Sequence, residues 1–152
     1  MQTSFIHLRV SSEFSISRGL LRINEIIENA QKLNMPAVAL SDLNNMFGMV
    51  KFFKKAEAAG IKPIAGTILN LRSRSGELGE VLCLAKNNDG LKSLMGIISQ
   101  SQLQQENGYI SITFEDLSSC VGNIMVISGG SSSTIFNLAK LKKNQDLKTE
   151  LS

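Results

Sequence analysis

Residues Met35–Gly66 read MPAVALSDLNNMFGMVKFFKKAEAAGIKPIAG, and this stretch sets the fold class. Pro36 ends a preceding helical pattern, and the apolar run Ala37–Asp42 has the length of a short buried strand. A second helical pattern follows and ends at Gly60, a residue suited to the left-handed position after a helix. Another apolar run then begins at Ile61. Strand, helix and strand in this order predict an α/β fold.

The rest of the chain continues this alternation of helical patterns and apolar runs. The polar turn RSRSGELG separates two apolar runs that lie close enough to form a hairpin. Together the patterns predict mainly parallel strands with helices outside, in a barrel or an open sheet. Helices are expected over 19–35, 44–60, 89–105 and 133–144, and strands over 5–10, 37–42, 61–71, 80–87 and 123–130.

The composition is that of a globular domain rather than a disordered chain. Hydrophobic residues make up 43% of the 152 residues, and charged residues make up 19%. No apolar run approaches the roughly 20 residues of a membrane span, and the N-terminus lacks the pattern of a secretory signal. Cys83 and Cys120 lack CxxC spacing, so we expect reduced thiols and a cytoplasmic location. The net charge of +3 is too small to establish nucleic-acid binding.

Two ionisable residues near expected strand ends are candidates for a site. His7 is the single histidine of the chain and stands among apolar residues, which favours a structural role over catalysis. Asp42 follows a buried strand, where it can cap the next helix or pair with Arg9 or Arg18. We expect these structural roles rather than acid–base chemistry.

Two groups of hydroxyl residues also have a structural alternative. Ser11, Ser12 and Ser15 resemble a nucleophile cluster, but a serine nucleophile needs an adjacent general base. Hydrogen bonding within a turn is therefore expected for them. The segment SGGSSS at 128–133 resembles a phosphate-cradling turn before a helix, although it lacks the Walker lysine pattern.

Four segments occur in an order and at distances typical of one known family. They read FIHLRVSSEFS, MPAVALSDLNNMFGMVKFFKKAEAAGIKPIAG, LCLAKNNDGLKSL and VISGG. They resemble the PHP (polymerase and histidinol phosphatase) domain at the N-terminus of bacterial DNA polymerase III alpha subunits, most strongly over 5–130. The resemblance implies a distorted (βα)7 barrel. Because such a barrel needs about 200 or more residues, residues 1–152 are expected to form its N-terminal portion, with the barrel incomplete.

Active members of this family hold metal ions at the strand ends, and the resemblance identifies the matching positions here. None of these positions carries an imidazole, a carboxylate or a thiolate, the side chains that bind such ions. The two arginines among them would repel divalent cations. The resemblance therefore implies a degenerate site with no catalytic residue, metal or other cofactor. The seven positions are Arg9, Ser11, Arg18, Leu43, Ile68, Gln102 and Gly130.

The family also implies a function. Its parent enzyme is a DNA-directed DNA polymerase, a nucleotidyltransferase of DNA replication, whereas the present portion is expected to be inactive alone. In alpha subunits of the gamma-proteobacterial type, which have lost ligands similarly, the domain supports the polymerase body and docks the proofreading exonuclease (epsilon) subunit. We expect a scaffold whose partners are that subunit and the rest of the polymerase III core, with DNA reached only through the parent enzyme.

Two other functions and self-association stay open as alternatives. A metal-dependent PHP phosphoesterase or 3′–5′ exonuclease would need several filled ligand positions. A phosphate or nucleic-acid binding module would use Arg9 and Arg18, because an arginine-lined pocket can hold an anion without hydrolysing it. An incomplete barrel also exposes a sheet edge, which predicts self-association through that edge unless local rearrangement covers it.

Overall fold

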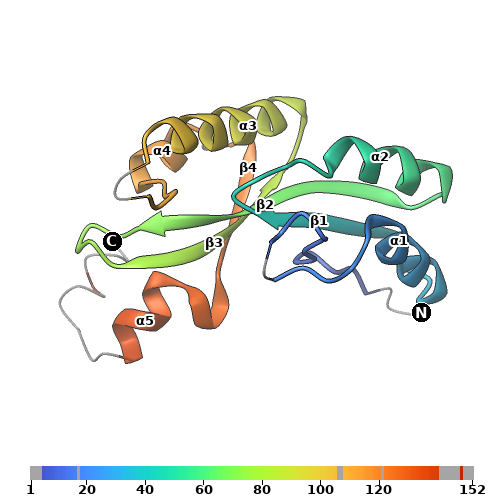
Figure 1. The fold of residues 1–152 in the computed structure, drawn as a ribbon, viewed down its shortest axis with the longest axis horizontal. Coiled ribbons are helices and arrows are strands. Elements are labelled where there is room, and N and C mark those ends of the chain that lie inside the picture. The colour runs from blue at the N-terminus through green and yellow to red at the C-terminus, as the bar shows by residue number, and fades with distance from the viewer. Residues whose placement is uncertain (1–4, 17, 106–107, 121, 141–147, 149–152) are drawn as a thin grey trace. The chain divides into compact units, whose positions relative to one another are not determined.

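The computed structural model describes residues 5–16, 18–105, 108–120, 122–140 and 148. The chain divides into two compact units, the first ending at Thr67 and the second beginning at Ile68. Helices alternate with four strands in the sheet order β1-β2-β3-β4, which confirms the α/β class (Figure 1). The elements are α1 (Ile23–Lys32), β1 (Ala37–Leu43), α2 (Met49–Ala58), β2 (Lys62–Arg72), β3 (Leu78–Ala85), α3 (Asn88–Leu103), α4 (Phe114–Ser118), β4 (Ile124–Ser128), the 3₁₀ turn η1 (Gly130–Ser132) and α5 (Thr134–Lys140).

The first unit contains the expected strand–helix–strand arrangement of β1, α2 and the beginning of β2. Helix α1 packs against α2 and β1 through its buried face. This helix begins later than the pattern predicts, because the Glu25 carboxylate accepts a hydrogen bond from the Arg22 backbone N–H at 2.7 Å and fixes the start at Ile23. Leu20, which fits the apolar spacing of the helix, lies outside it and is 95% exposed.

Both helices of the first unit end in the same backbone motif. After α2, Gly60 has a φ of +72°, and the N–H groups of Gly60 and Ile61 donate to the carbonyls of Glu57 and Ala56. This confirms the left-handed position predicted for Gly60. After α1, Asn34 takes the left-handed position with a φ of 51°. Each motif turns the chain directly into a strand.

The segment Phe5–Val10 is not a regular strand, in contrast to the sequence expectation. Its backbone still follows β1, because the N–H groups of Ala39 and Ser41 donate to the carbonyls of His7 and Val10 at 2.9 and 2.8 Å. The Val10 N–H, however, donates a hydrogen bond to the Ser41 hydroxyl oxygen at 3.0 Å. A side chain here takes the place that a backbone carbonyl would have in a strand ladder.

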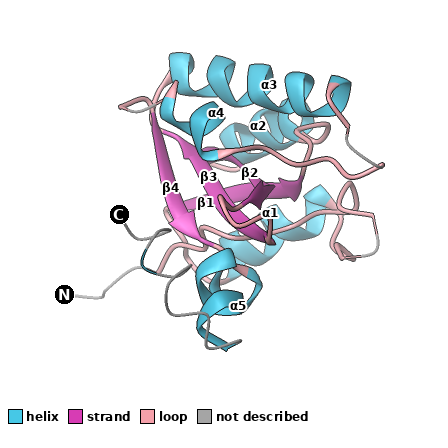
Figure 2. Ribbon diagram, turned by 90° about the vertical axis from the view of Figure 1, so that its left-hand side faces the viewer, coloured by secondary structure: helices cyan, strands magenta, loops and turns pink. Residues whose placement is uncertain are grey.

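The second unit places helices on both sides of a strand pair. Helices α3 and α5 both pack against β3, and they lie on opposite sides of the β3–β4 pair (Figures 1 and 2). The pair is antiparallel, from Val81 opposite Ser128 to Ala85 opposite Ile124. This pair is an exception to the parallel arrangement that the sequence favours.

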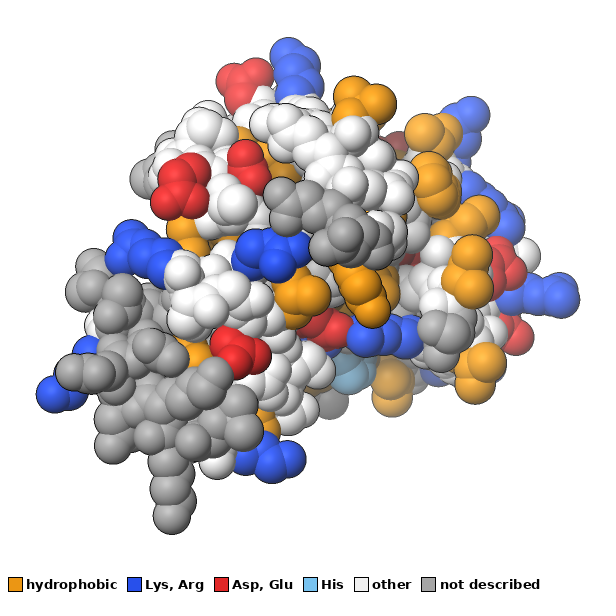
Figure 3. Space-filling model, turned by 60° about the vertical axis from the view of Figure 1, so that its left-hand side comes forward, with side chains coloured by type: hydrophobic (Ala, Val, Ile, Leu, Met, Phe, Trp, Pro, Cys, Tyr) orange, Lys and Arg blue, Asp and Glu red, His pale blue; other side chains and the backbone are white. Residues whose placement is uncertain are grey.

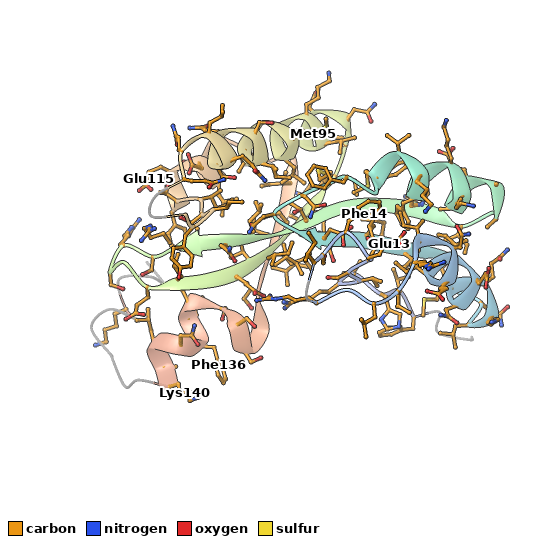
Figure 4. All side chains as sticks on the ribbon, viewed as in Figure 1. Glu13, Phe14, Met95, Glu115, Phe136 and Lys140 are labelled. Carbon is orange, nitrogen blue, oxygen red and sulfur yellow. The ribbon has the colours of Figure 1, made fainter. Side chains whose placement is uncertain are left out.

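The remaining expected elements of the second unit lie close to their predicted positions. Strands β2 and β3 are neighbours in the sheet and are joined by the predicted polar turn, in which Gly76 has a φ of +86°. Helix α5 carries Phe136 and Lys140 (Figure 4). The predicted continuation of this helix to residue 144 lies outside the described residues. Within the described part of the chain, no helix has both the length and the apolar character needed to cross a membrane.

Candidate functional site

The candidate site of the first unit is the turn that follows Val10, together with the end of β1. Two anchors hold the turn on the strand. The Ser11 hydroxyl donates to the Ser41 carbonyl at 3.1 Å, and the Ser41 hydroxyl also donates to the Val10 carbonyl at 3.2 Å. The sequence therefore places small hydroxyl residues where two backbone segments come together.

The carboxylate of Asp42 is the centre of this turn. It is 1% exposed, and one of its oxygens accepts hydrogen bonds from the Ser12 N–H at 2.7 Å and the Ser15 hydroxyl at 2.6 Å. Its other oxygen accepts a hydrogen bond from the Ser12 hydroxyl at 2.7 Å. Hydrogen bonds of this kind compensate a buried negative charge for its lost hydration.

Asp42 does not cap the next helix, which was one of the two structural roles predicted for it. Helix α2 has Gly48 at its N-cap position, without a side-chain cap. The carboxylate instead accepts hydrogen bonds from the serine turn. The Ser15 hydroxyl, which donates to this carboxylate, also accepts a hydrogen bond from the Leu43 N–H at 3.0 Å. The prediction that the serines serve as turn-forming groups is confirmed for Ser11, Ser12 and Ser15.

Two further polar side chains support the same turn, and the sequence analysis did not single them out. The Asn45 amide donates to the carbonyls of Phe14 and Leu43 at 3.0 and 2.9 Å. The Thr67 hydroxyl donates to the Asp42 carbonyl at 2.9 Å. Both residues are buried. Their signal in the sequence is a polar residue within an apolar strand, for Thr67, or just after one, for Asn45.

Glu13, which Figure 4 labels, forms ion pairs with Lys51 of α2 and with Arg22, the residue just before α1. One carboxylate oxygen lies 3.4 Å from the Lys51 ammonium of α2, and the other lies 3.9 Å from the Arg22 guanidinium. These side chains are partly or largely exposed, so the ion pairs contribute little to stability.

Arg9 and Arg18, the two predicted anion-binding residues, are both exposed. A cavity of about 340 Å³ lies between the N-terminal segment and α1. Arg9 lines this cavity together with His7 and Ser11, whereas Arg18 is not part of its lining. The imidazole of His7 packs edge-on against Phe5, with ring centroids 4.7 Å apart, and is the pale-blue side chain of Figure 3. The phosphate or nucleic-acid binding function stays a prediction.

The second unit contains the other three positions that the resemblance identified. Ile68 on β2 is a buried core side chain, 3% exposed. Gln102 lies exposed in the last turn of α3. Gly130 begins the turn η1 with a φ of +62°. None of these residues supplies a nitrogen, carboxylate or sulfur ligand of the kind that a metal cluster requires.

The last hydroxyl of the predicted phosphate-cradling turn at 128–133 forms hydrogen bonds within the chain. The Ser133 hydroxyl donates to the Gly130 carbonyl at 2.8 Å and accepts a hydrogen bond from the Phe136 N–H at 3.1 Å. Ser133 therefore supports the start of α5, which is a short helix of 7 residues.

The side chains of the site do not fit the metal cluster that the family resemblance implies. The one carboxylate at the end of β1 already accepts three hydrogen bonds from serine groups. Across the described ranges of the chain, no group of three or more His, Cys, Asp or Glu residues lies in an arrangement that could hold a metal ion. We therefore derive no metal-dependent step for these residues.

Comparisons with known proteins agree with the resemblance. The model of the PHP domain family matches residues 7–151. The chain is 37% identical over 131 residues to the DNA polymerase III subunit alpha of Pseudomonas fluorescens, covering 84% of this chain and 11% of that protein. It is 38% identical over 146 residues to the subunit of the same name from Vibrio cholerae, covering 93% of this chain and 12% of that protein.

The fold also has a counterpart among solved structures. An amidohydrolase from Chromobacterium violaceum, described with bound sulfate and no metal, matches with a TM-score of 0.50 at 19% identity. The match covers 64% of this chain and 32% of that protein. The chain spans only about a tenth of the length of the curated relatives named above. It belongs to the PHP domain family and is homologous to the N-terminal region of DNA polymerase III alpha subunits.

Proposed function

We propose that this chain is the N-terminal portion of a metal-free PHP domain that acts as a non-catalytic scaffold in a replicative DNA polymerase III. The observation that carries the proposal is the set of side chains at the end of β1 and the hydrogen bonds of Asp42 there. The positions that the resemblance assigns to ligands there are Arg9, Ser11 and Leu43, and the Asp42 carboxylate accepts hydrogen bonds from the serine turn. In this proposal the hydrogen-bonded turn has a structural role and no catalytic one.

The parent protein is, in this proposal, a DNA-directed DNA polymerase of the cytoplasm. The basis is the similarity to alpha subunits from several bacteria. The polymerase chemistry would belong to residues outside the present chain. The chain itself would contribute surface, rigidity and contacts to the polymerase core.

Absence of hydrolysis tests the non-catalytic part of the proposal. The chain is incubated with Mn²⁺ and bis(p-nitrophenyl) phosphate, and with a single-stranded oligonucleotide labelled at its 5′ end. We expect no turnover above a blank that contains protein treated with chelator. Manganese-dependent hydrolysis that copurifies with the chain, and that a second preparation reproduces, would restore the phosphoesterase function.

Docking of the proofreading exonuclease (epsilon) subunit is the second part of the proposal. The subunit of the same organism is mixed with the chain and analysed by size-exclusion chromatography with light scattering. A stoichiometric complex supports docking on this portion of the domain. Separate elution of both proteins at concentrations of tens of micromolar would contradict docking here, and would leave the non-catalytic reading intact.

Self-association is a further element of the proposal. Strand β4 is the last strand of the described sheet, and Met125 and Val126 on it are each 47% exposed. An apolar terminal strand favours pairing with a second copy. Sedimentation velocity should detect a dimer whose fraction rises with concentration, and Val126→Lys should lower that fraction. A monomer at every concentration would contradict this element.

A further inference from the structure

The cavity between the N-terminal segment and α1 combines an apolar interior with a small number of polar groups. Its volume of about 340 Å³ lies at the lower end of the range of small-molecule sites. Most of its lining is hydrocarbon, contributed by the chain just before α1, by α1 itself, by the loop after it and by the start of β1. These apolar side chains include Leu21, Ile26, Leu33, Met35 and Val38.

Among the described residues of the lining, Arg9 holds the one fixed charge, which is positive. Arg9 and His7 are the ionisable residues of the lining, and none of the described residues that line the cavity is Asp or Glu. Ser11 and Asn29 add a hydroxyl and an amide. A guanidinium has five N–H donors in a planar arrangement, so it can bind a carboxylate in addition to another partner. Electrostatic complementarity therefore favours a single negative group.

We propose that this cavity binds a small amphipathic anion, with a carboxylate at Arg9 and an apolar chain against the face of α1. This binding function is separate from the scaffold function, and the cavity includes Arg9 and Ser11, two of the positions that the resemblance assigns to ligands. Bare phosphate fits it less well, because the apolar lining gains nothing from an ion that has no hydrocarbon part. A long lipid chain exceeds its volume.

The surroundings of the cavity support a preformed site. The backbone bonds from Ala39 to His7 and from Ser41 to Val10 hold the polar wall against β1. The opposite wall is the regular helix α1, whose start and end are both fixed by hydrogen bonds. A ligand would then bind without ordering the chain, which lowers the cost of association.

Octanoate is the probe for the test, with three comparison compounds. Octylammonium has the same chain and the opposite charge, whereas acetate and inorganic phosphate are anions without a chain. Binding to the full 152-residue protein is followed by isothermal titration calorimetry and by amide chemical shifts. We expect octanoate to bind one-to-one with a Kd below about 1 mM, and the other three at least tenfold more weakly.

Two variants and a matched control locate the site. Arg9→Gln removes the guanidinium, and Asn29→Trp fills the cavity with a bulky ring; both positions are exposed, so the fold is retained. Each should weaken octanoate binding at least about tenfold. Arg22→Gln is the control, because Arg22 is a nearby exposed arginine outside the lining. It should change the Kd less than about twofold.

Several results would overturn the proposal. Equal affinity for octanoate and acetate would show that the apolar lining takes no part. Equal affinity for octanoate and octylammonium would remove the role of Arg9. An equal loss in Arg22→Gln and Arg9→Gln would show binding by general surface charge.

Discussion

At the scale of single residues, the buried carboxylate of Asp42 depends on three donors from one short turn. Ser12 supplies its N–H and its hydroxyl, and Ser15 supplies a second hydroxyl. The turn and the carboxylate need each other, because either one alone would leave buried polar groups without partners. The residue thereby links the N-terminal segment to the first strand of the sheet.

Replacing Asp42 with asparagine tests this link. The amide can accept hydrogen bonds with only one of its two terminal atoms, so at least one serine donor loses its acceptor. We expect Asp42→Asn to lower the free energy of unfolding in urea by about 2–4 kcal/mol. The control is Asp89→Asn, an aspartate whose side chain is 73% exposed, and it should cost at most about 1 kcal/mol. Equal losses in the two variants would contradict this role of Asp42.

The thiol of Cys83 predicts a pH dependence of stability. Its side chain is 0% exposed, and burial, with a smaller electrostatic contribution from Cys120, raises its pKa from 9.0 to about 12. The thiol in the unfolded chain therefore loses its proton at a lower pH than the thiol in the folded chain. Stability from this group is complete below pH 9 and is lost as the pH rises towards 12.

Urea unfolding at a series of pH values from 8 to 11 measures this effect. The folded protein should lose free energy of unfolding above about pH 9, by at most about 3 kcal/mol from this thiol at about pH 11. Cys83→Ala, which has no titrating group at this position, should lose less over the same range. Parallel curves for the two proteins would argue against a raised pKa of Cys83.

At the scale of elements, α3 fits against the loop before β4 because of one glycine. A methyl group at Gly90 would overlap the Asn123 carbonyl oxygen, which already accepts a hydrogen bond from the Lys86 N–H at 2.9 Å. Gly96 on the same helix has no such neighbour within 4 Å. One helix thus contains a glycine needed for packing and a glycine that is not.

Alanine at these two positions should act in opposite directions. Gly90→Ala forces the helix away from the loop, so we expect a loss of about 1–3 kcal/mol. Gly96→Ala should gain up to about 1 kcal/mol, because alanine favours a helix interior more than glycine does. Thermal unfolding followed by circular dichroism measures both. A stable Gly90→Ala protein would mean that α3 does not approach the loop this closely.

The elements also show which parts of the fold the sequence can predict. The end of α2 was predictable because a glycine in the left-handed conformation is a local requirement at Gly60. The start of α1 was not, because Leu20 has helical spacing, yet the bond from Arg22 to Glu25 sets the first turn. The segment 5–10 has a strand pattern, but its Val10 N–H donates to the Ser41 hydroxyl rather than to a backbone carbonyl of a neighbouring strand.

At the scale of the whole molecule, the family could be predicted from the sequence, but the hydrogen bonds of Asp42 could not. The resemblance identified Leu43 and Ile68 as hydrocarbon in place of ligands. The partners of Asp42 depend on Ser12 and Ser15, which lie about thirty residues earlier in the chain. Helix capping by Asp42 was equally reasonable from spacing alone, and the structure places Gly48 at that cap instead. Long-range hydrogen bonds of this kind leave no local pattern.

The proposed scaffold function depends on a second proposal, that the site has lost metal binding. Arg9 holds a fixed charge at a position that the resemblance assigns to a ligand, and the Asp42 carboxylate accepts hydrogen bonds from the serine turn. The most direct measurement is the metal content of the chain, purified without chelator, dialysed against Mn²⁺ or Zn²⁺ and analysed by inductively coupled plasma mass spectrometry. The account predicts well below one bound metal per chain. One or more tightly held ions per chain, released only by chelator, would contradict it.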